Sequence, residues 1–145
     1  EVKRRSPSAG EFAAVAEGPA AVAALGRAYA DAGATALSIL TEPTRFGGSD
    51  DDLSAAAHLG PPVLRKDFTV DPVQVWQARA LGAGAVLRTG RALSGEGLHG
   101  CLEAAAEAGI DALVEVNVGA NRCGCDAFAV CIATRDDLAL PTRSW

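Results

Sequence analysis

The sequence has few of the features that mark membrane-bound, secreted or nucleic-acid-binding proteins. Its apolar runs are soon interrupted by Gly, Arg or Asp, so none approaches the roughly 20 residues that cross a bilayer. The opening residues 1–5 lack the apolar core of a signal peptide. Lys and Arg number 13 against 18 Asp and Glu, for a net charge of −5, which disfavours a polyphosphate partner. We therefore expect a cytoplasmic protein without a membrane or nucleic-acid partner.

Histidine and cysteine are also scarce. Three of the 4 cysteines crowd into residues 123–131, whereas the only 2 histidines, His58 and His99, lie well upstream. A metal site needs paired C-x-x-C spacing or nearby histidines, and neither is present. The spacing favours reduced thiols, and we expect no bound metal.

The chain does have enough apolar residues for a core. Its length of 145 residues and hydrophobic content of 49% predict one globular domain. Short apolar runs without alternation are typical of parallel strands that are covered on both faces. Such runs recur at 35–40, 62–64, 85–87, 112–116 and 127–132.

Helical patterns lie between these runs, over 19–33, 71–82 and 94–109 when the capping residues are counted. Asp71 and Ser94 are expected N-caps, and each pattern ends at a glycine. Alternating strands and helices predict right-handed β-α-β units and an α/β fold with a parallel sheet. A closed barrel and an open doubly wound sheet both fit, and in either fold ligands gather at the carboxyl ends of the strands.

Charged residues follow or interrupt the expected strands. Glu1 and Lys3 are two residues apart in an opening strand and so share one side of it. Lys66 follows the second apolar run, and Glu115 lies within the fourth, where a carboxylate is costly unless it faces a polar cavity or a cation. Such a set can perform acid and base chemistry. An internal ion-pair network without catalysis explains it equally well.

Longer motifs resemble a known family. They come in the order and spacing of signature segments of indole-3-glycerol phosphate synthase, a (β/α)8-barrel family of tryptophan biosynthesis, and the resemblance extends to about residue 116. The segments are Glu-Val-Lys-Arg-Arg-Ser-Pro-Ser-Ala-Gly (1–10), Leu-Thr-Glu-Pro-Thr-Arg-Phe-Gly-Gly-Ser (40–49), Pro-Val-Leu-Arg-Lys-Asp-Phe-Thr-Val-Asp-Pro (62–72) and Ala-Leu-Val-Glu-Val (112–116).

The resemblance implies an α/β fold of the (β/α)8 TIM-barrel type in incomplete form, with about six strands from the first to the sixth βα unit. Residues 1–145 then form a single partial barrel domain with a divergent tail at 117–145. Residues 117–125 make a poor helix by propensity. In the tail Arg135 matches the family, and the resemblance implies that it binds the substrate. The family's catalytic asparagine falls on Ala133 or Cys131, and its later phosphate-binding loops have no counterpart.

The resemblance also implies a carboxy-lyase that acts on a phosphorylated small molecule without a cofactor. Such an enzyme converts 1-(2-carboxyphenylamino)-1-deoxyribulose 5-phosphate to indole-3-glycerol phosphate by ring closure, with loss of carbon dioxide and water. Lys66 would be the general acid, and Glu115 the base or stabilising carboxylate that assists loss of water. Glu1 would be a second carboxylate, and Lys3 would bind the substrate carboxylate or phosphate.

Further residues are expected to bind this substrate. By the resemblance, Ser6 would help bind the carboxyl group, and Phe46 and Phe68 would pack on the anthranilate ring. Arg88 stands where the family has an apolar pocket wall. It would either bind the phosphate or carboxylate in compensation, or be a solvated substitution, which the usual surface preference of arginine favours.

Two other functions stay open. A relative that has lost the asparagine and the phosphate loops would serve as a binding or interaction module, and another phosphate-sugar enzyme could use the same scaffold. A partial barrel leaves strand edges and apolar faces bare, so we also expect self-association or pairing with a complementing fragment.

Overall fold

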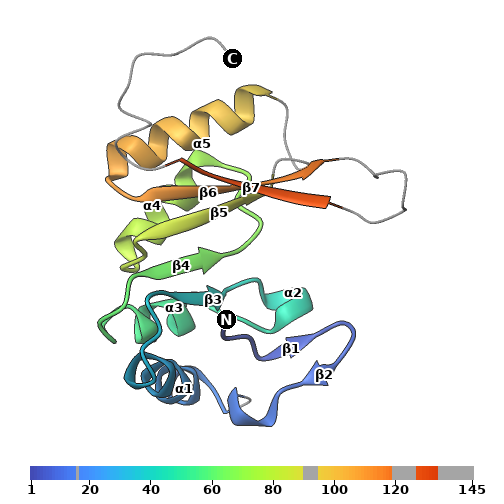
Figure 1. The fold of residues 1–145 in the computed structure, drawn as a ribbon, viewed down its shortest axis with the longest axis vertical. Coiled ribbons are helices and arrows are strands. Elements are labelled where there is room, and N and C mark those ends of the chain that lie inside the picture. The colour runs from blue at the N-terminus through green and yellow to red at the C-terminus, as the bar shows by residue number, and fades with distance from the viewer. Residues whose placement is uncertain (16, 90–94, 119–126, 134–145) are drawn as a thin grey trace.

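A computed structural model of the chain describes residues 1–15, 17–89, 95–118 and 127–133. These residues form a five-stranded sheet in the order β3-β4-β5-β6-β7, with a short hairpin, β1-β2, beside it (Figure 1). The elements are β1 (Arg5–Ser6), β2 (Gly10–Glu11), a 3-10 turn (Ala13–Val15), α1 (Pro19–Asp31), β3 (Leu37–Leu40), α2 (Pro43–Phe46), α3 (Asp50–Ala56), β4 (Val63–Lys66), α4 (Pro72–Ala80), β5 (Ala85–Thr89), α5 (Gly95–Ala108), β6 (Asp111–Val118) and β7 (Ala127–Ala133).

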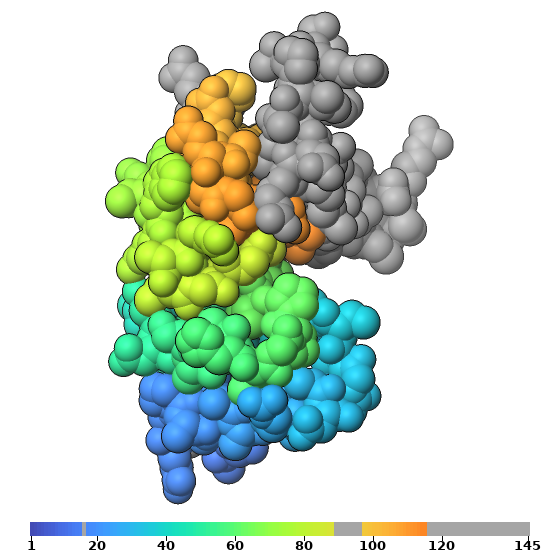
Figure 2. Space-filling model, turned by 90° about the vertical axis from the view of Figure 1, so that its left-hand side faces the viewer, coloured from blue at the N-terminus to red at the C-terminus, as the bar shows by residue number. Residues whose placement is uncertain are grey.

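Strands β3 to β6 are parallel, as the sequence predicted. Each strand lies beside the next one along the chain, so these four strands contain no point at which the strand order reverses. An open doubly wound sheet has such a switch point, whereas a barrel does not. The described sheet therefore has the strand order of a barrel segment. Figure 2 shows the same succession from the side, with the elements following one another along the long axis.

The three expected helices are confirmed. The second begins at Pro72 with a capping box between Asp71 and Gln74, and the other two are α1 and α5. The expected Ser94 cap lies outside the described residues. Where the sequence suggested an opening strand, only Val2 bridges the sheet, in parallel with Ile39.

The last strand corrects the sequence prediction. β7 pairs with β6 in the antiparallel direction, from Ala112↔Ala133 to Val118↔Ala127, whereas a sheet of β-α-β units predicted a parallel strand. An apolar run shows that a segment is a strand but carries no information on its direction, which is why the pattern failed here.

The core lies between the sheet and the helices. Val63 and Val86 from the sheet pack there with Leu53 of α3 and Val75 of α4, all of them almost completely buried. Because successive side chains of a strand point to opposite faces, Lys66 lies on the face that the core does not fill. No helix in the described ranges has the length and apolar content to span a bilayer.

Candidate active site

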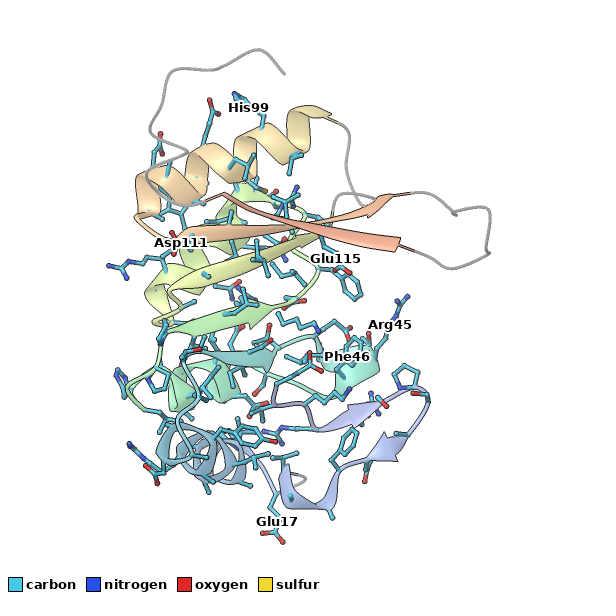
Figure 3. All side chains as sticks on the ribbon, in the orientation of Figure 1. Glu17, Arg45, Phe46, His99, Asp111 and Glu115 are labelled. Atoms are coloured by element: carbon cyan, nitrogen blue, oxygen red, sulfur yellow. The ribbon has the colours of Figure 1, made fainter. Side chains whose placement is uncertain are left out.

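The polar side chains of interest lie at one edge of the sheet. β3 to β6 are parallel, so their carboxyl ends meet at that edge. In Figure 3, Glu115 of β6 lies there with Arg45 and Phe46 of α2, whereas Asp111, at the start of β6, lies at the opposite end. The edge also receives the opening segment, because the backbone of Val2 hydrogen-bonds to Ser38 and Leu40 of β3.

Glu1 joins the two lysines of the predicted site. One carboxylate oxygen accepts a hydrogen bond from Lys66 Nζ, and the other lies 3.4 Å from Lys3 Nζ. The three side chains are between 33% and 38% exposed, so they stand at the surface where a ligand can reach them. The Lys3 ammonium also lies 5.6 Å from the centre of the Phe12 ring. The structure thus brings Glu1, Lys3 and Lys66 into one cluster from two separate segments.

The two cations change the titration of Glu1. Partial burial on its own would raise the pKa of the Glu1 carboxyl, but hydrogen bonding and charge attraction from Lys66, followed by those from Lys3, outweigh it and lower the pKa. Glu1 therefore stays ionised to lower pH than a free glutamate and keeps a negative charge between the two ammonium groups.

Glu115 lies on the same sheet face as Lys66. Glu115 is in register with Thr89 of β5 and Leu113 with Leu87, while Leu64 of β4 is in register with Ala85. β4 and β6 are separated by β5 alone, so they run about 10 Å apart, twice the strand spacing of ~4.8 Å. Among the described residues the Glu115 side chain makes no hydrogen bond or ion pair, while its backbone pairs with β5 and β7. A small molecule could lie between its carboxylate and the Lys66 ammonium.

Two aromatic side chains lie near this edge. Phe68 follows β4 and is 42% exposed, and the Arg45 guanidinium lies 5.5 Å from the centre of its ring. Phe46 ends α2, a helix whose first turn is capped by the Glu42 carboxylate; Glu42 accepts hydrogen bonds from the backbone N–H groups of Thr44, Arg45 and Phe46. Burial would raise the pKa of Glu42, but these bonds and that of the Thr44 hydroxyl lower it.

Ser6 lies in the β1-β2 hairpin. Its hydroxyl accepts a hydrogen bond from the backbone N–H of Ala9 at 3.0 Å and lies 3.5 Å from the Ser8 hydroxyl. The neighbouring Arg5 donates to the carbonyl oxygens of Pro43 and Thr44 in α2. The hairpin is thereby attached to the segment that carries Phe46, and the Ser6 hydroxyl bonds within the hairpin rather than to either lysine.

The solvated position considered for Arg88 is wrong. Its side chain is 1% exposed, and its guanidinium donates to the carbonyl oxygens of Thr69 and, at 3.3 Å, Gly97. Arg88 is in register with Val114 and shares a strand face with buried Val86, so it points to the helix side of the sheet, away from Lys66. These two backbone carbonyls accept from its terminal nitrogens, while its buried Nε has no hydrogen-bond partner among the described residues. The structure does not bring Arg88 to the Lys66 cluster. Arg135 lies outside the described residues.

The sequence interpretation missed a polar cluster next to Lys66, formed by Thr41, Arg65 and Asp67. The Thr41 hydroxyl donates to Asp67 Oδ2 at 2.6 Å and accepts from Arg65 Nε at 3.2 Å. A signal was available, since alternation along β4 places Arg65 on the face opposite Lys66 and therefore toward the helices. A buried arginine in that position requires acceptors, and the neighbouring acids supply them.

The described residues include no group of three or more His, Cys, Asp or Glu side chains placed to hold a metal ion. The side chains of Cys123, Cys125 and Cys131 lie outside what the structure describes. Cys101 is a free, buried thiol in α5, and His99 pairs at 3.1 Å with Glu103 on the exposed face of that helix. The described side chains of the site itself are amines, carboxylates and aromatic rings.

Consecutive parallel strands with helices on one face, and ionisable groups at their carboxyl ends, define a segment of a (β/α) barrel with a ligand site in the usual place for that class. Comparison with known proteins agrees. The family model described as indole-3-glycerol phosphate synthase matches residues 1–123. Curated relatives with that name include proteins from Parafrankia sp. (strain EAN1pec), 52% identical over 118 residues, and Kineococcus radiotolerans, 49% identical over 118 residues.

Each of these alignments covers 81% of this chain and 42% of the relative, and a relative from Saccharopolyspora erythraea is 52% identical with the same coverage. The chain belongs to the indole-3-glycerol phosphate synthase family, whose members are TIM barrels. It spans about four-tenths of the length of these relatives and carries part of such a barrel.

Proposed function

We propose that the carboxyl-end cluster takes part in the reaction of indole-3-glycerol phosphate synthase, the closure of 1-(2-carboxyphenylamino)-1-deoxyribulose 5-phosphate to the indole with loss of carbon dioxide and water. The observation that carries the proposal is the joining of Glu1, Lys3 and Lys66 in one surface cluster. An anionic aromatic substrate requires cations beside an apolar wall, and Phe68 and Phe46 lie near the same edge.

The proposed roles follow from position and charge. Lys66 is the general acid that protonates the substrate carbonyl, and Glu115, across β5 from it, accepts the proton lost during dehydration. A lysine acid and a glutamate base in one site have the opposite protonation states that such chemistry needs. Lys3 holds the substrate carboxylate or phosphate. Glu1 keeps both ammonium groups in place through its ion pairs.

The test is the fluorescence of indole-3-glycerol phosphate formed by this chain and by Lys66→Ala. Removal of a general acid lowers kcat by about 100-fold or more. Lys66 is 38% exposed, and exposed ion pairs add little to stability, so the variant should unfold at the same temperature as the parent. Arg79→Ala, which removes an exposed cation from α4, is the matched control and should keep full activity. Turnover that is equal in all three proteins would refute the proposal.

A second candidate is a binding module that retains the substrate but does not convert it. It is favoured by the antiparallel β7, which occupies the edge of β6 where a barrel has its next parallel strand. Binding of the reduced, unreactive substrate analogue, measured by titration calorimetry, tests it. Lys66-dependent binding without turnover would support the module, and Lys66-dependent turnover would exclude it.

The cellular setting and the assembly are proposals of the same kind. We place the protein in the cytoplasm, where tryptophan synthesis takes place. We also propose self-association, or pairing with a complementing barrel fragment, because the sheet face that carries Lys66 leaves the apolar side chains of Leu64 and Leu113 partly exposed. Analytical ultracentrifugation that finds a monomer at all concentrations would exclude self-association.

A further inference from the structure

The polar cluster of Thr41, Arg65 and Asp67 lies next to two residues of the proposed site. Asp67 separates Lys66 from Phe68 in the sequence, and its Oδ1 accepts a hydrogen bond from the Phe68 backbone N–H at 2.8 Å. The other oxygen, Oδ2, accepts from the Thr41 hydroxyl at 2.6 Å and from Arg65 at 3.4 Å. Both oxygens of Asp67 are thus engaged at the point where β4 ends.

The Thr41 hydroxyl joins two strands. Thr41 directly follows β3, and its backbone N–H donates to the carbonyl oxygen of Lys66 at 3.1 Å. Thr41 is 3% exposed, so its hydroxyl is shielded from water and holds the Asp67 carboxylate in one position. Thr41 therefore joins the ends of β3 and β4 through two hydrogen bonds, one to the carbonyl oxygen of Lys66 and one to the side chain of Asp67.

Arg65 holds the cluster against the helices. It is 5% exposed and donates to the Asp50 carboxylate of α3 at 3.1 Å. In α4 it donates to the backbone carbonyl of Gln74 and to the side-chain oxygen of Gln77. Because so many partners depend on it, removal of Arg65 would disturb helix packing as well as the strand end. Thr41 is the member whose hydroxyl acts on Asp67 without holding a helix.

We propose that Asp67, fixed by Thr41 and Arg65, is a positioning residue that sets the backbone turn from Lys66 to Phe68, and with it the placement of the Lys66 ammonium and the Phe68 ring toward the substrate. This inference rests on the proposed function for its catalytic consequence, but its geometric part does not. Both oxygens of the Asp67 carboxylate are taken up by Thr41, Arg65 and the Phe68 backbone N–H, so its role is to position these neighbours rather than to react. It acts through the backbone on either side of it.

The test compares Thr41→Val with Thr41→Ser. Valine has nearly the same shape as threonine but lacks the hydroxyl, so Asp67 loses its closest partner and Arg65 Nε loses an acceptor. Serine keeps the hydroxyl and both bonds. A misplacement of about 1 Å at a reacting group costs up to about 100-fold in rate. We expect kcat to fall at least tenfold in Thr41→Val, with KM changed less, and to stay within threefold of the parent in Thr41→Ser. Both are measured at temperatures where circular dichroism shows fully folded protein.

A second readout needs no turnover. The chain has lysines only at positions 3 and 66, so acetic anhydride labelling followed by mass spectrometry gives the reactivity of each amine. If Lys66 loses its place beside Glu1, its labelling rate rises in Thr41→Val but not in Thr41→Ser, each compared with the parent protein labelled under the same conditions. This measurement tests the positioning role even in a protein without activity.

The outcomes separate the two proposals. Parent activity that depends on Lys66 supports the proposed function, and its absence refutes that function alone. Unchanged kcat and unchanged Lys66 labelling in Thr41→Val would overturn the positioning role. A fall in the melting temperature without a change in either quantity would show a purely structural cluster, and would overturn it as well.

Discussion

The buried ion pair between Arg4 and Asp52 predicts a large loss of stability in Asp52→Asn. Asp52 is 1% exposed; its Oδ2 accepts from Arg4 Nε at 2.9 Å and from the backbone N–H of Ser49 at 3.1 Å. Its Oδ1 accepts a second hydrogen bond from Arg4. Hydrogen bonding to Asp52, aided by charge attraction and opposed by burial, raises the pKa of Arg4. Asparagine would turn a donor or an uncharged acceptor toward this guanidinium.

The magnitude follows from the burial of the two partners. Removing one member of a buried ion pair costs ~3–5 kcal/mol, because the other charge is left without a partner. The Arg4 side chain retains 19% exposure, so water relieves part of this cost and we expect about 3 kcal/mol. Domains of this kind have a total of about 5–15 kcal/mol. At about 2–4 °C per kcal/mol, the melting temperature should fall by about 6–12 °C.

The assay is thermal and urea unfolding followed by far-UV circular dichroism. The control is Asp51→Asn, an exposed neighbour in the first turn of α3, where loss of a carboxylate near the helix N-terminus costs about 0.3–1 kcal/mol. A loss in Asp52→Asn no greater than that in Asp51→Asn would refute the reasoning, since the pair would then contribute no more than a surface charge.

Two further predictions concern Glu1 and Gly48. Because its pKa is lowered, Glu1 contributes stability above the ordinary value of 4.5, and this contribution is lost as the pH falls through the folded-state pKa. A 13C titration of its carboxyl should have a midpoint below 4.5 that rises in Lys66→Met; an unchanged midpoint would contradict this. In Gly48→Ala the new methyl would lie 2.1 Å from the Leu40 carbonyl oxygen, so we expect a loss of at least ~1–3 kcal/mol in urea unfolding. Gly100→Ala, whose nearest contact is 3.4 Å, is its control and should lose less.

The strands of the sheet could be predicted from the sequence more completely than the segments that connect them. The apolar run at 85–87 lies within β5, but the run at 62–64 covers only the first half of β4, which continues through Arg65 and Lys66. The predicted strand ended before these two charged residues, whereas the buried Arg65 side chain has acceptors in Thr41 and Asp50 that allow the strand to continue. α3 was not among the predicted helices, although Ser49 and Asp52 form a capping box that gives a readable signal.

The set of site residues was open to prediction in part. Side chains at the ends of parallel strands must approach one another, so Lys66 and Glu115 could be expected on one edge from alternation and strand order alone. The contact of Arg45 with Phe68 was not foreseeable, because it depends on how a four-residue helix is placed against the loop after β4. Arg88 was misjudged because average surface preference says nothing about two backbone carbonyls that happen to lie within its reach.

The pairing of β6 with β7 has a kinetic consequence. Along the edge of β6 from Ala112 to Val118, the backbone N–H and C=O groups are already paired with β7. Any parallel strand that extends the barrel at this edge must compete with β7 for the same groups. Its addition is a displacement reaction rather than a simple association. At high concentration of an incoming strand the rate should therefore reach a plateau, set by how often β7 separates from its neighbour.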